Sequence, residues 1–367
     1  MFTIRTRDFG GEMEFIHETH SPRVIFGEHS LSTIKAELEL IGATSITFIS
    51  DENTQEVAQK IFADLGEIVK QEIKHVAMHV PDEFSAPIIS AASELGVNAI
   101  VAIGGGSSTG LGKILALELN LPLVVIPTTY AGSEMTPIWG RTRNKEKVTG
   151  VDQRVLPKTV LYAPQLTHTL PLSITVNSGM NAIAHAVEAL YAPQLSPLVE
   201  LAALKGIEVM AHGLRKIAKN LGDNSAREDL FYGAMLCGFT LGNSKMGIHH
   251  KICHTLGGMY NLPHAQMHSA VLPYAVKYNE GVAHSQMSKV AAILGGERAS
   301  QGLWDLSTAI GAETSLGKLN FPATESAKVA DSMSSYPLVN PRAFDSEIVV
   351  KLLQAASTGS RPDDESW

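Results

Sequence analysis

Five of the chain's 14 histidines fall within one stretch, GIHHKICHTLGGMYNLPHAQMH, at positions 247–268. His250 and His254 are four residues apart, so on a helix their side chains share one face. His264 follows after turn-like residues. Imidazole binds metal ions and transfers protons near neutral pH, whereas a single histidine on an apolar helix is more often an ordinary core residue. His249 and His268 have the weakest case for chemistry, and we expect them at the surface.

A second segment, NSGMNAIAHAVEAL, offers a matching pair. Asn181 and His185 have the same four-residue spacing on a predicted helix. Two such pairs and His264, from the following loop, can converge on one point. That arrangement suits either a metal ion or a set of proton and hydrogen-bond donors. The metalloprotease motif HEXXH does not occur in the sequence, which excludes that class of zinc enzyme.

A glycine-rich turn, GGGSSTGLGK at residues 104–113, follows a predicted strand and opens a predicted helix. Free backbone N–H groups and the helix dipole at such a turn favour a phosphate. The turn fits neither the Rossmann fingerprint, which would need glycine at Thr109, nor the P-loop, which would need glycine at Ser107. Phosphate binding is the favoured interpretation, and a tight turn without a ligand is the alternative.

Polar residues end two further predicted strands. The segment PTTYAGSEMT, at 127–136, follows one of them, and Asp51 ends the other. Open parallel sheets bind cofactors outside the carboxyl ends of neighbouring strands, so we expect these loops beside the glycine turn. Asp51 is then placed to accept a hydrogen bond from a ribose hydroxyl, and capping of the next helix is the alternative.

The elements that carry these residues change character along the chain. In the first part, short apolar runs such as SITFIS and NAIVAIGGG alternate with helical segments, which predicts a parallel sheet with crossover helices. Later segments are long and apolar at helical spacing. We expect an α/β dinucleotide-binding domain at 1–165, an all-α substrate and catalytic domain at 166–367, and a frayed C-terminal tail.

Composition narrows the class of protein. The chain has 367 residues, 44% apolar and 18% charged, with a net charge of 29 − 37 = −8. The negative charge argues against nucleic acid and anionic membranes as partners. Two cysteines are too few for a disulfide framework, and the first residues do not form a signal peptide. We expect a soluble cytoplasmic protein without membrane segments.

The order of the motifs resembles the iron-containing alcohol dehydrogenase family, which shares its fold with dehydroquinate synthase. The motifs span nearly the whole chain: FG in RVIFGEHSL, GGGS, PTTxxGSE, S-G-M-x-A-x-x-H-A-x-E, and H-x-x-x-H followed by PH. The resemblance implies this fold, a nicotinamide cofactor, frequent dimers, and a metal ion held by one aspartate and three histidines. The histidine slots are His185, His250 and His264, whereas the aspartate slot holds Asn181.

The chain departs from the family pattern at Asn181 and in the glycine turn, where Gly110 replaces an aspartate. These departures, together with PTTYAGSE, HHKICHTLGG and NPR at 340–342, are similar to one branch of the family. That branch reduces 2-maleylacetate to 3-oxoadipate in aromatic catabolism, with NADH or NADPH and without metal. An amide is a poor ligand for iron and does not repel a dicarboxylate. We therefore expect a small dicarboxylate substrate, NADH with NADPH also accepted, no metal, and a homodimer.

The resemblance also implies roles for individual residues. The expected proton and hydrogen-bond donors are His185, His250, His264 and, for the final proton, His254. The expected substrate contacts are Asn181, Tyr130 and Lys251. The expected cofactor contacts are Asp51, Gly104, Gly105, Gly106, Ser107, Thr128, Thr129, Ser133 and Lys147. For Lys147 a loop position in solvent is the alternative, and for Lys251 a solvent-facing side chain.

Three other functions remain open. A metal-dependent alcohol dehydrogenase would tolerate Asn181 as a ligand and act on a small alcohol or aldehyde. A silent nucleotide-binding regulator would bind NADH without turnover. A dehydroquinate synthase-like lyase is disfavoured, because that branch keeps its metal carboxylate.

Overall fold

The computed structural model describes residues 7–9, 12–14, 17–19, 21–144, 146–335, 337–363, 365 and 367. It divides into two compact units, His20–Leu170 and Pro171–Trp367, with the segment up to Thr19 grouped with the second. Sequence analysis drew the boundary at 165 and counted the N-terminal residues with the α/β domain. Strands β1 (Arg7–Phe9) and β2 (Glu12–Glu14), in the segment up to Thr19, pair with each other and not with the large sheet.

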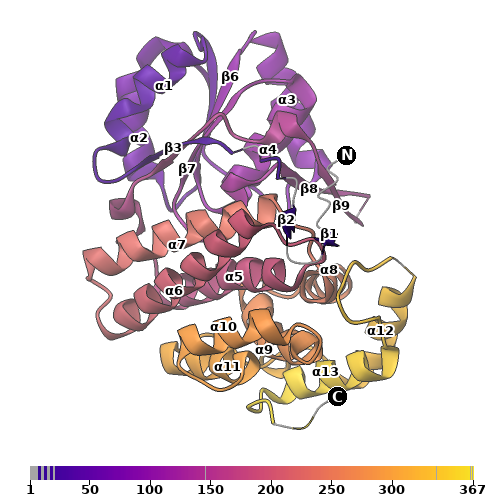
Figure 1. Ribbon diagram of the computed structural model, residues 1–367. Coiled ribbons are helices and arrows are strands. Elements are labelled where there is room, and N and C mark those ends of the chain that lie inside the picture. Colours follow the sequence, from indigo (N-terminus) through magenta and orange to yellow (C-terminus); the bar gives the residue numbers. More distant parts are fainter. Residues whose placement is uncertain are drawn as a thin grey trace. The chain divides into compact units, whose positions relative to one another are not determined.

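The α/β unit is built on a six-stranded sheet in which every pairing is parallel, with the order β3-β10-β7-β6-β4-β5. Its strands are β3 (Arg23–Phe26), β4 (Ile46–Ile49), β5 (Val69–Ile73), β6 (Ala99–Gly104), β7 (Leu123–Pro127) and β10 (Thr159–Tyr162). The crossover helices are α1 (Ile34–Leu40), α2 (Gln55–Leu65), α3 (Asp82–Glu94) and α4 (Gly106–Leu119). This arrangement confirms the predicted parallel α/β fold (Figure 1).

The alternation of side chains along each strand builds a core on both faces of this sheet. On β6, Val101 and Ile103 pack in a cluster with residues of α1 and α2, whereas Ile100 and Ala102 pack in another with residues of α4. Such two-sided burial explains why the strand reads as a continuous apolar run in the sequence. The carboxyl ends of these strands are therefore held rigidly at one edge.

One hairpin in this unit was not predicted. Strands β8 (Ile138–Arg143) and β9 (Glu146–Val151) pair antiparallel. Lys147 lies on β9 opposite Thr142, so the interpretation of Lys147 as a loop residue is wrong. The charged residues of this segment hide its strand alternation in the sequence, because both faces carry polar side chains.

The second unit is helical, as predicted. Its helices are α5 (Leu172–Tyr191), α6 (Pro197–Lys219), α7 (Asn224–Gly242), α8 (Ile248–Tyr260), α9 (His264–Glu280), α10 (His284–Leu294), α11 (Ala299–Ile310), α12 (Ser326–Ser334) and α13 (Ser346–Thr358). Helix α5 is buried along most of its length and packs against α6, α7 and α9. In the described part of the chain, no helix is both long and apolar enough to span a bilayer.

The described C-terminal residues are docked, so the prediction of a frayed tail is wrong. Arg361 forms two hydrogen bonds with Asp305 of α11, at 2.7 and 2.8 Å. Asp363 pairs with the buried Lys277 of α9, whose ammonium also lies 4.5 Å from the centre of the Trp367 ring. The charges that suggested solvation are satisfied by partners from distant parts of the sequence.

Candidate active site

The glycine turn has a geometry that requires glycine. Gly104 ends β6 with φ = +142°, and a Cβ there would lie 2.3 Å from Ser108 Oγ and 2.4 Å from Asp51 Oδ2. A Cβ on Gly106, the first residue of α4, would meet no atom within 4 Å. The 14-residue helix α4 thus begins at a glycine with open space around it. A phosphate can approach the backbone N–H groups of such a helix start closely.

The structure brings the predicted cofactor residues to one edge of the sheet. Strand β6 lies between β4 and β7, so the loops after all three strands are neighbours. Ser108 Oγ donates to Asp51 Oδ2 at 3.1 Å, and Thr128 N donates to Gly104 O at 3.0 Å. Thr128 is buried, whereas Thr129, Gly105, Ser107 and Ser133 are half-buried beside the same turn. These residues fit a dinucleotide at the strand ends.

Asp51 also organises the turn before α2. Its Oδ1 accepts from Asn53 N at 3.0 Å, and the N-cap of α2 is Thr54. Asp51 is therefore not the cap itself, although it supports the turn that leads into the helix. Its second carboxylate oxygen faces the glycine turn through Ser108. The position at the end of the strand beside β6 is where dinucleotide-binding folds place an acidic residue for the ribose.

Three buried ionisable residues beneath these loops were missed by the sequence analysis. Lys113 Nζ donates to three backbone carbonyls of residues 133–138, and Tyr162 OH donates to Glu134 Oε1 at 2.7 Å. Burial lowers the pKa of Lys113 to about 7, and it raises the pKa of Glu134. The signal was a lone lysine in the apolar run LGKILALEL, because a buried lysine needs hydrogen-bond partners.

Tyr130 and Lys147 are the remaining predicted site residues of this unit. Tyr130 is fully buried, and Lys147 is exposed on β9. Asn181 and the histidines belong to the helical unit, so the structure does not bring Tyr130 together with them inside one unit.

The helical unit gathers six histidines from three helices. His185 lies on α5, and His264 is the first residue of α9 rather than part of a loop. The His185 and His250 rings are stacked with centroids 5.1 Å apart, and the His250 and His254 rings are 6.1 Å apart. His185 and His250 are buried, whereas His254 and His264 are exposed. The structure therefore brings His185 of the first predicted pair beside His250 of the second.

Burial keeps the His185 ring neutral. It lowers the pKa of His185 well below its usual range, and the neighbouring His250 and His264 act in the same direction. Lys251, beside this cluster on α8, is half-buried, and burial lowers its pKa too.

Glu188 is a site residue that the sequence analysis did not name. It is 1% exposed, and its carboxylate accepts from the backbone N–H groups of His249 and His250. The same carboxylate contacts Nδ1 of the His250 ring directly. Asn181, His185 and Glu188 are spaced i, i+4, i+7 on α5, which is the pattern of one helix face. That spacing was the signal in the sequence.

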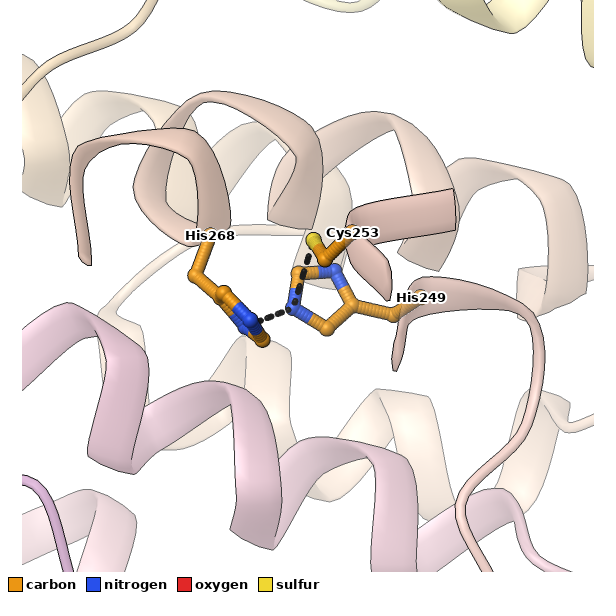
Figure 2. A group of neighbouring side chains, drawn as sticks. All are labelled: His249, Cys253 and His268. Carbon is orange, nitrogen blue, oxygen red and sulfur yellow. Dashed lines mark hydrogen bonds between the residues drawn. The ribbon is translucent and has the colours of Figure 1, made fainter. Parts of the chain in front are cut away.

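His249 and His268 are fully buried, so the prediction that they lie at the surface is wrong. Figure 2 shows His249 Nε2 beside His268 Nδ1, at 3.0 Å, with Cys253 Sγ 3.9 Å from His249 Nε2. The three atoms are close enough to hold a metal ion. However, His249 Nδ1 and His268 Nε2 lack any hydrogen-bond partner among the described residues. Metal-binding histidines usually donate their second N–H to an acceptor, so we interpret this group as a hydrogen-bonded pair.

Other polar atoms of the cluster are buried without partners in the described part of the chain. They are Asn181 Oδ1, His185 Nδ1 and His250 Nε2. Each such atom costs about 1–3 kcal/mol when it stays unpaired, so their concentration marks a place where a polar ligand binds.

Asn181 weakens a site for the family's metal ion without abolishing it, because three histidines alone can hold zinc. Three neutral imidazoles and the neutral amide of Asn181 leave the charge of a divalent ion without an anionic ligand. In addition, within the described chain, the group that brings three ligand atoms within 4.8 Å of one another is His249, Cys253 and His268, not His185, His250 and His264. We therefore derive no catalytic step through such an ion.

Comparisons with known proteins agree with the motifs. Residues 21–164 match the family model described as iron-containing alcohol dehydrogenase. Residues 175–357 match the model described as the C-terminal part of the Fe-containing alcohol dehydrogenase family. Together the two models account for most of the chain.

Comparisons with individual proteins show which members of the family are similar to this chain. The chain is 44% identical to a maleylacetate reductase of Burkholderia cepacia over 348 residues, covering 95% of this chain and 99% of that protein. The crystal structure of maleylacetate reductase from Rhizobium sp. strain MTP-10005 matches with a TM-score of 0.91 at 39% identity, covering 95% and 99% of the two chains. The structure of maleylacetate reductase from Agrobacterium tumefaciens gives a TM-score of 0.91 at 37% identity, covering 96% and 100%.

Proposed function

The chain belongs to the iron-containing alcohol dehydrogenase family, and on that premise we propose that it reduces the C=C bond of 2-maleylacetate to 3-oxoadipate with NADH or NADPH. It is an oxidoreductase. We further propose that the reaction proceeds without a metal ion among the histidines. The observation that carries this proposal is Asn181 in the family's carboxylate slot, buried with an unpartnered Oδ1.

The substrate's charge explains the value of an amide at this position. Maleylacetate carries two carboxylates, and an aspartate about 4 Å from one of them would repel it by roughly 4 kcal/mol at an effective dielectric of about 20. Asn181 removes this repulsion and can donate a hydrogen bond through its amide nitrogen. Compared with aspartate, asparagine at position 181 therefore improves binding of the dicarboxylate relative to a small neutral alcohol.

The residues of the α/β unit bind different parts of the cofactor. When bound, the nicotinamide supplies the hydride that reduces the C=C bond. The open helix start at Gly106 and the glycine turn hold the pyrophosphate, and Thr128, Thr129 and Ser133 line the nicotinamide side. Asp51 binds the ribose and disfavours a 2′-phosphate by charge repulsion, so NADH is preferred.

The histidines act on the charge that develops after hydride transfer. Negative charge builds on the ketone oxygen as an enolate, and donors already aimed at it lower the barrier. An imidazolium at His250 can donate through Nε2 while Nδ1–H stays on Glu188, which stabilises the cation. His185 and His264 complete the donor set, and the exposed His254 delivers the final proton. Lys251, beside the histidines, meets a substrate carboxylate.

One observation favours a second candidate, a metal-dependent alcohol dehydrogenase acting on a small alcohol or aldehyde. If His250 is neutral, its contact with Glu188 through Nδ1 leaves a lone pair on Nε2. A carboxylate behind a histidine in this manner is common in zinc and iron sites. That function predicts stoichiometric metal and chelator-sensitive alcohol turnover.

The test is NADH oxidation by EDTA-treated protein with freshly generated maleylacetate, with metal content measured by ICP-MS. The proposal expects full activity at substoichiometric metal. Asn181→Asp is expected to raise KM for maleylacetate by up to about a thousandfold and to gain Zn²⁺ or Fe²⁺ binding. Chelator-sensitive activity, with an ion lost together with turnover, would sink the metal-free mechanism.

The expectations of a homodimer and of a cytoplasmic location stay predictions. Light scattering on the purified protein measures the first.

A further inference from the structure

Lys113 is a lysine in the middle of helix α4 that is 1% exposed. A buried ammonium is stable only when its N–H groups are hydrogen-bonded or its charge is paired. The helix begins at Gly106, so Lys113 lies seven residues, or about 10 Å, further along its axis. The lysine is carried by the same rigid element whose first turn approaches the cofactor's phosphates in the proposed function.

The ammonium reaches across to the loop that follows β7. Nζ donates to Ser133 O at 2.6 Å, to Ile138 O at 2.7 Å and to Thr136 O at 2.8 Å. The Thr136 and Ser133 hydroxyls also lie 3.0 and 3.4 Å from Nζ, so the three N–H donors of the ammonium are shared among more acceptors than they can each serve singly. The acceptors span the short 3-10 turn η3 (Ser133–Met135) and the start of β8, which packs against α4 (Figure 1). One side chain thus fastens the whole segment 133–138 to the helix.

A second contact holds the same segment from the other side. Glu134 is 2% exposed, and its Oε1 accepts from the hydroxyl of Tyr162, at the end of β10. The opposite charges of Lys113 and Glu134 also attract each other. The loop that carries Ser133 is therefore fixed between α4 and β10 by buried polar contacts.

Other charged groups on the elements around α4 are paired with each other. Arg141 of β8 contacts Glu118 near the end of α4 at 2.7 Å, Arg143 of β8 contacts Asp82 of α3 at 2.6 Å, and Arg154 contacts Asp152 at 2.6 Å. Glu134 is the charged group that affects Lys113.

We propose that Lys113 is a positioning residue for the nicotinamide cofactor, because it sets the place of the 128–138 loop relative to the glycine turn. The inference rests on the proposed function in one respect, that these two loops bind the cofactor. It predicts that loss of Lys113 weakens cofactor binding and leaves dicarboxylate binding in the helical unit nearly unchanged.

Protonation gives this role a measurable signature. Burial lowers the pKa of Lys113 to about 7. A neutral amine has only two N–H groups for three carbonyls, so one acceptor loses its bond as pH rises. If the cofactor requires the fully bonded loop, the dissociation constant for NADH increases above pH 7 by up to about tenfold per pH unit.

The experiment measures NADH binding by fluorescence titration, and KM values for NADH and maleylacetate, from pH 6 to 9. Lys113→Met keeps the length of the side chain and removes the donors. Lys158→Met changes an exposed lysine of the same unit and serves as the control. We expect Lys113→Met to weaken NADH binding about tenfold to a hundredfold with a flat pH profile. The KM for maleylacetate and kcat at saturating NADH should change less than about threefold.

Equal increases in both KM values for Lys113→Met would overturn the proposal, since they would indicate general damage to the enzyme. A wild-type dissociation constant for NADH that is constant from pH 6 to 9 would also overturn it, and this measurement does not depend on the variant folding. NADH binding is measured without substrate. Failure of wild-type protein to reduce maleylacetate would therefore refute the proposed function while leaving this inference standing.

Discussion

The buried histidines predict that acid destabilises the helical unit. Burial lowers the pKa of His185, His249 and His268 well below the usual 6.5. In the folded protein these rings stay neutral below that pH, whereas in the unfolded chain they take up protons. The unfolded state then binds more protons, so stability is fully present above pH 6.5 and is lost as pH falls.

The magnitude follows from the number of groups. A ring that stays neutral in the fold loses about 2 kcal/mol of stability between pH 7 and pH 5, since unfolded histidine gains its proton near 6.5. Three such rings lose up to about 6 kcal/mol together. Typical domains have about 5–15 kcal/mol in total, so we expect the helical unit to unfold near pH 5.

The assay is urea denaturation at pH 7, 6 and 5, followed by tryptophan fluorescence, to which Trp304 and Trp367 of the helical unit and Trp139 of the α/β unit contribute. His268→Gln should reduce the pH dependence of the free energy of unfolding by about one third. His284→Gln, an exposed histidine on α10, should leave it unchanged. The same pH dependence in His268→Gln as in wild type, or a stability that does not change between pH 7 and 5, would refute the reasoning.

Two further predictions concern the glycine turn of the α/β unit and Glu188 of the helical unit. Gly104→Ala should abolish NADH binding and lower the free energy of unfolding by about 3 kcal/mol or more, because its Cβ would lie within 2.4 Å of neighbouring side-chain oxygens at a positive φ. The control Gly106→Ala, at a position with open space, should retain the fold. Fluorescence titration with NADH and thermal melting compare the two variants. Glu188→Gln removes the negative charge behind His250 and should lower kcat/KM for maleylacetate about a hundredfold. An unchanged kcat/KM would remove Glu188 from the mechanism.

The sequence predicted the elements whose patterns are local. The strand NAIVAIGGG and the glycine turn after it were readable because buried parallel strands are continuous apolar runs and a turn toward phosphate needs glycine. The meeting of His185 with His250 was also readable, since each shares a helix face with a second polar residue four positions away. These inferences depend on short-range geometry that the chain's own spacing sets.

What escaped the sequence depends on distant partners. The role of Lys113 was missed, because its carbonyl partners lie 20 to 25 residues further along the chain. His249 and His268 looked like surface residues, since their burial and mutual hydrogen bond arise only when α8 packs against α9. A buried polar residue is recognised by its hydrogen-bond partners, and those partners are known only from the tertiary structure.

The site keeps a buried carboxylate, and its position decides what that charge does. An aspartate in the Asn181 slot would face the ligand and cancel half of a metal ion's charge, but it would repel a dicarboxylate. Glu188 instead lies behind His250 and contacts its Nδ1. In the proposed metal-free reaction its charge faces a cation on the ring. The imidazolium then presents its Nε2–H toward a negatively charged ligand. In the proposed function, a negative charge behind the histidine and a neutral amide in front of it suit an anion better than a metal ion, as a substrate with two carboxylates and a developing enolate requires.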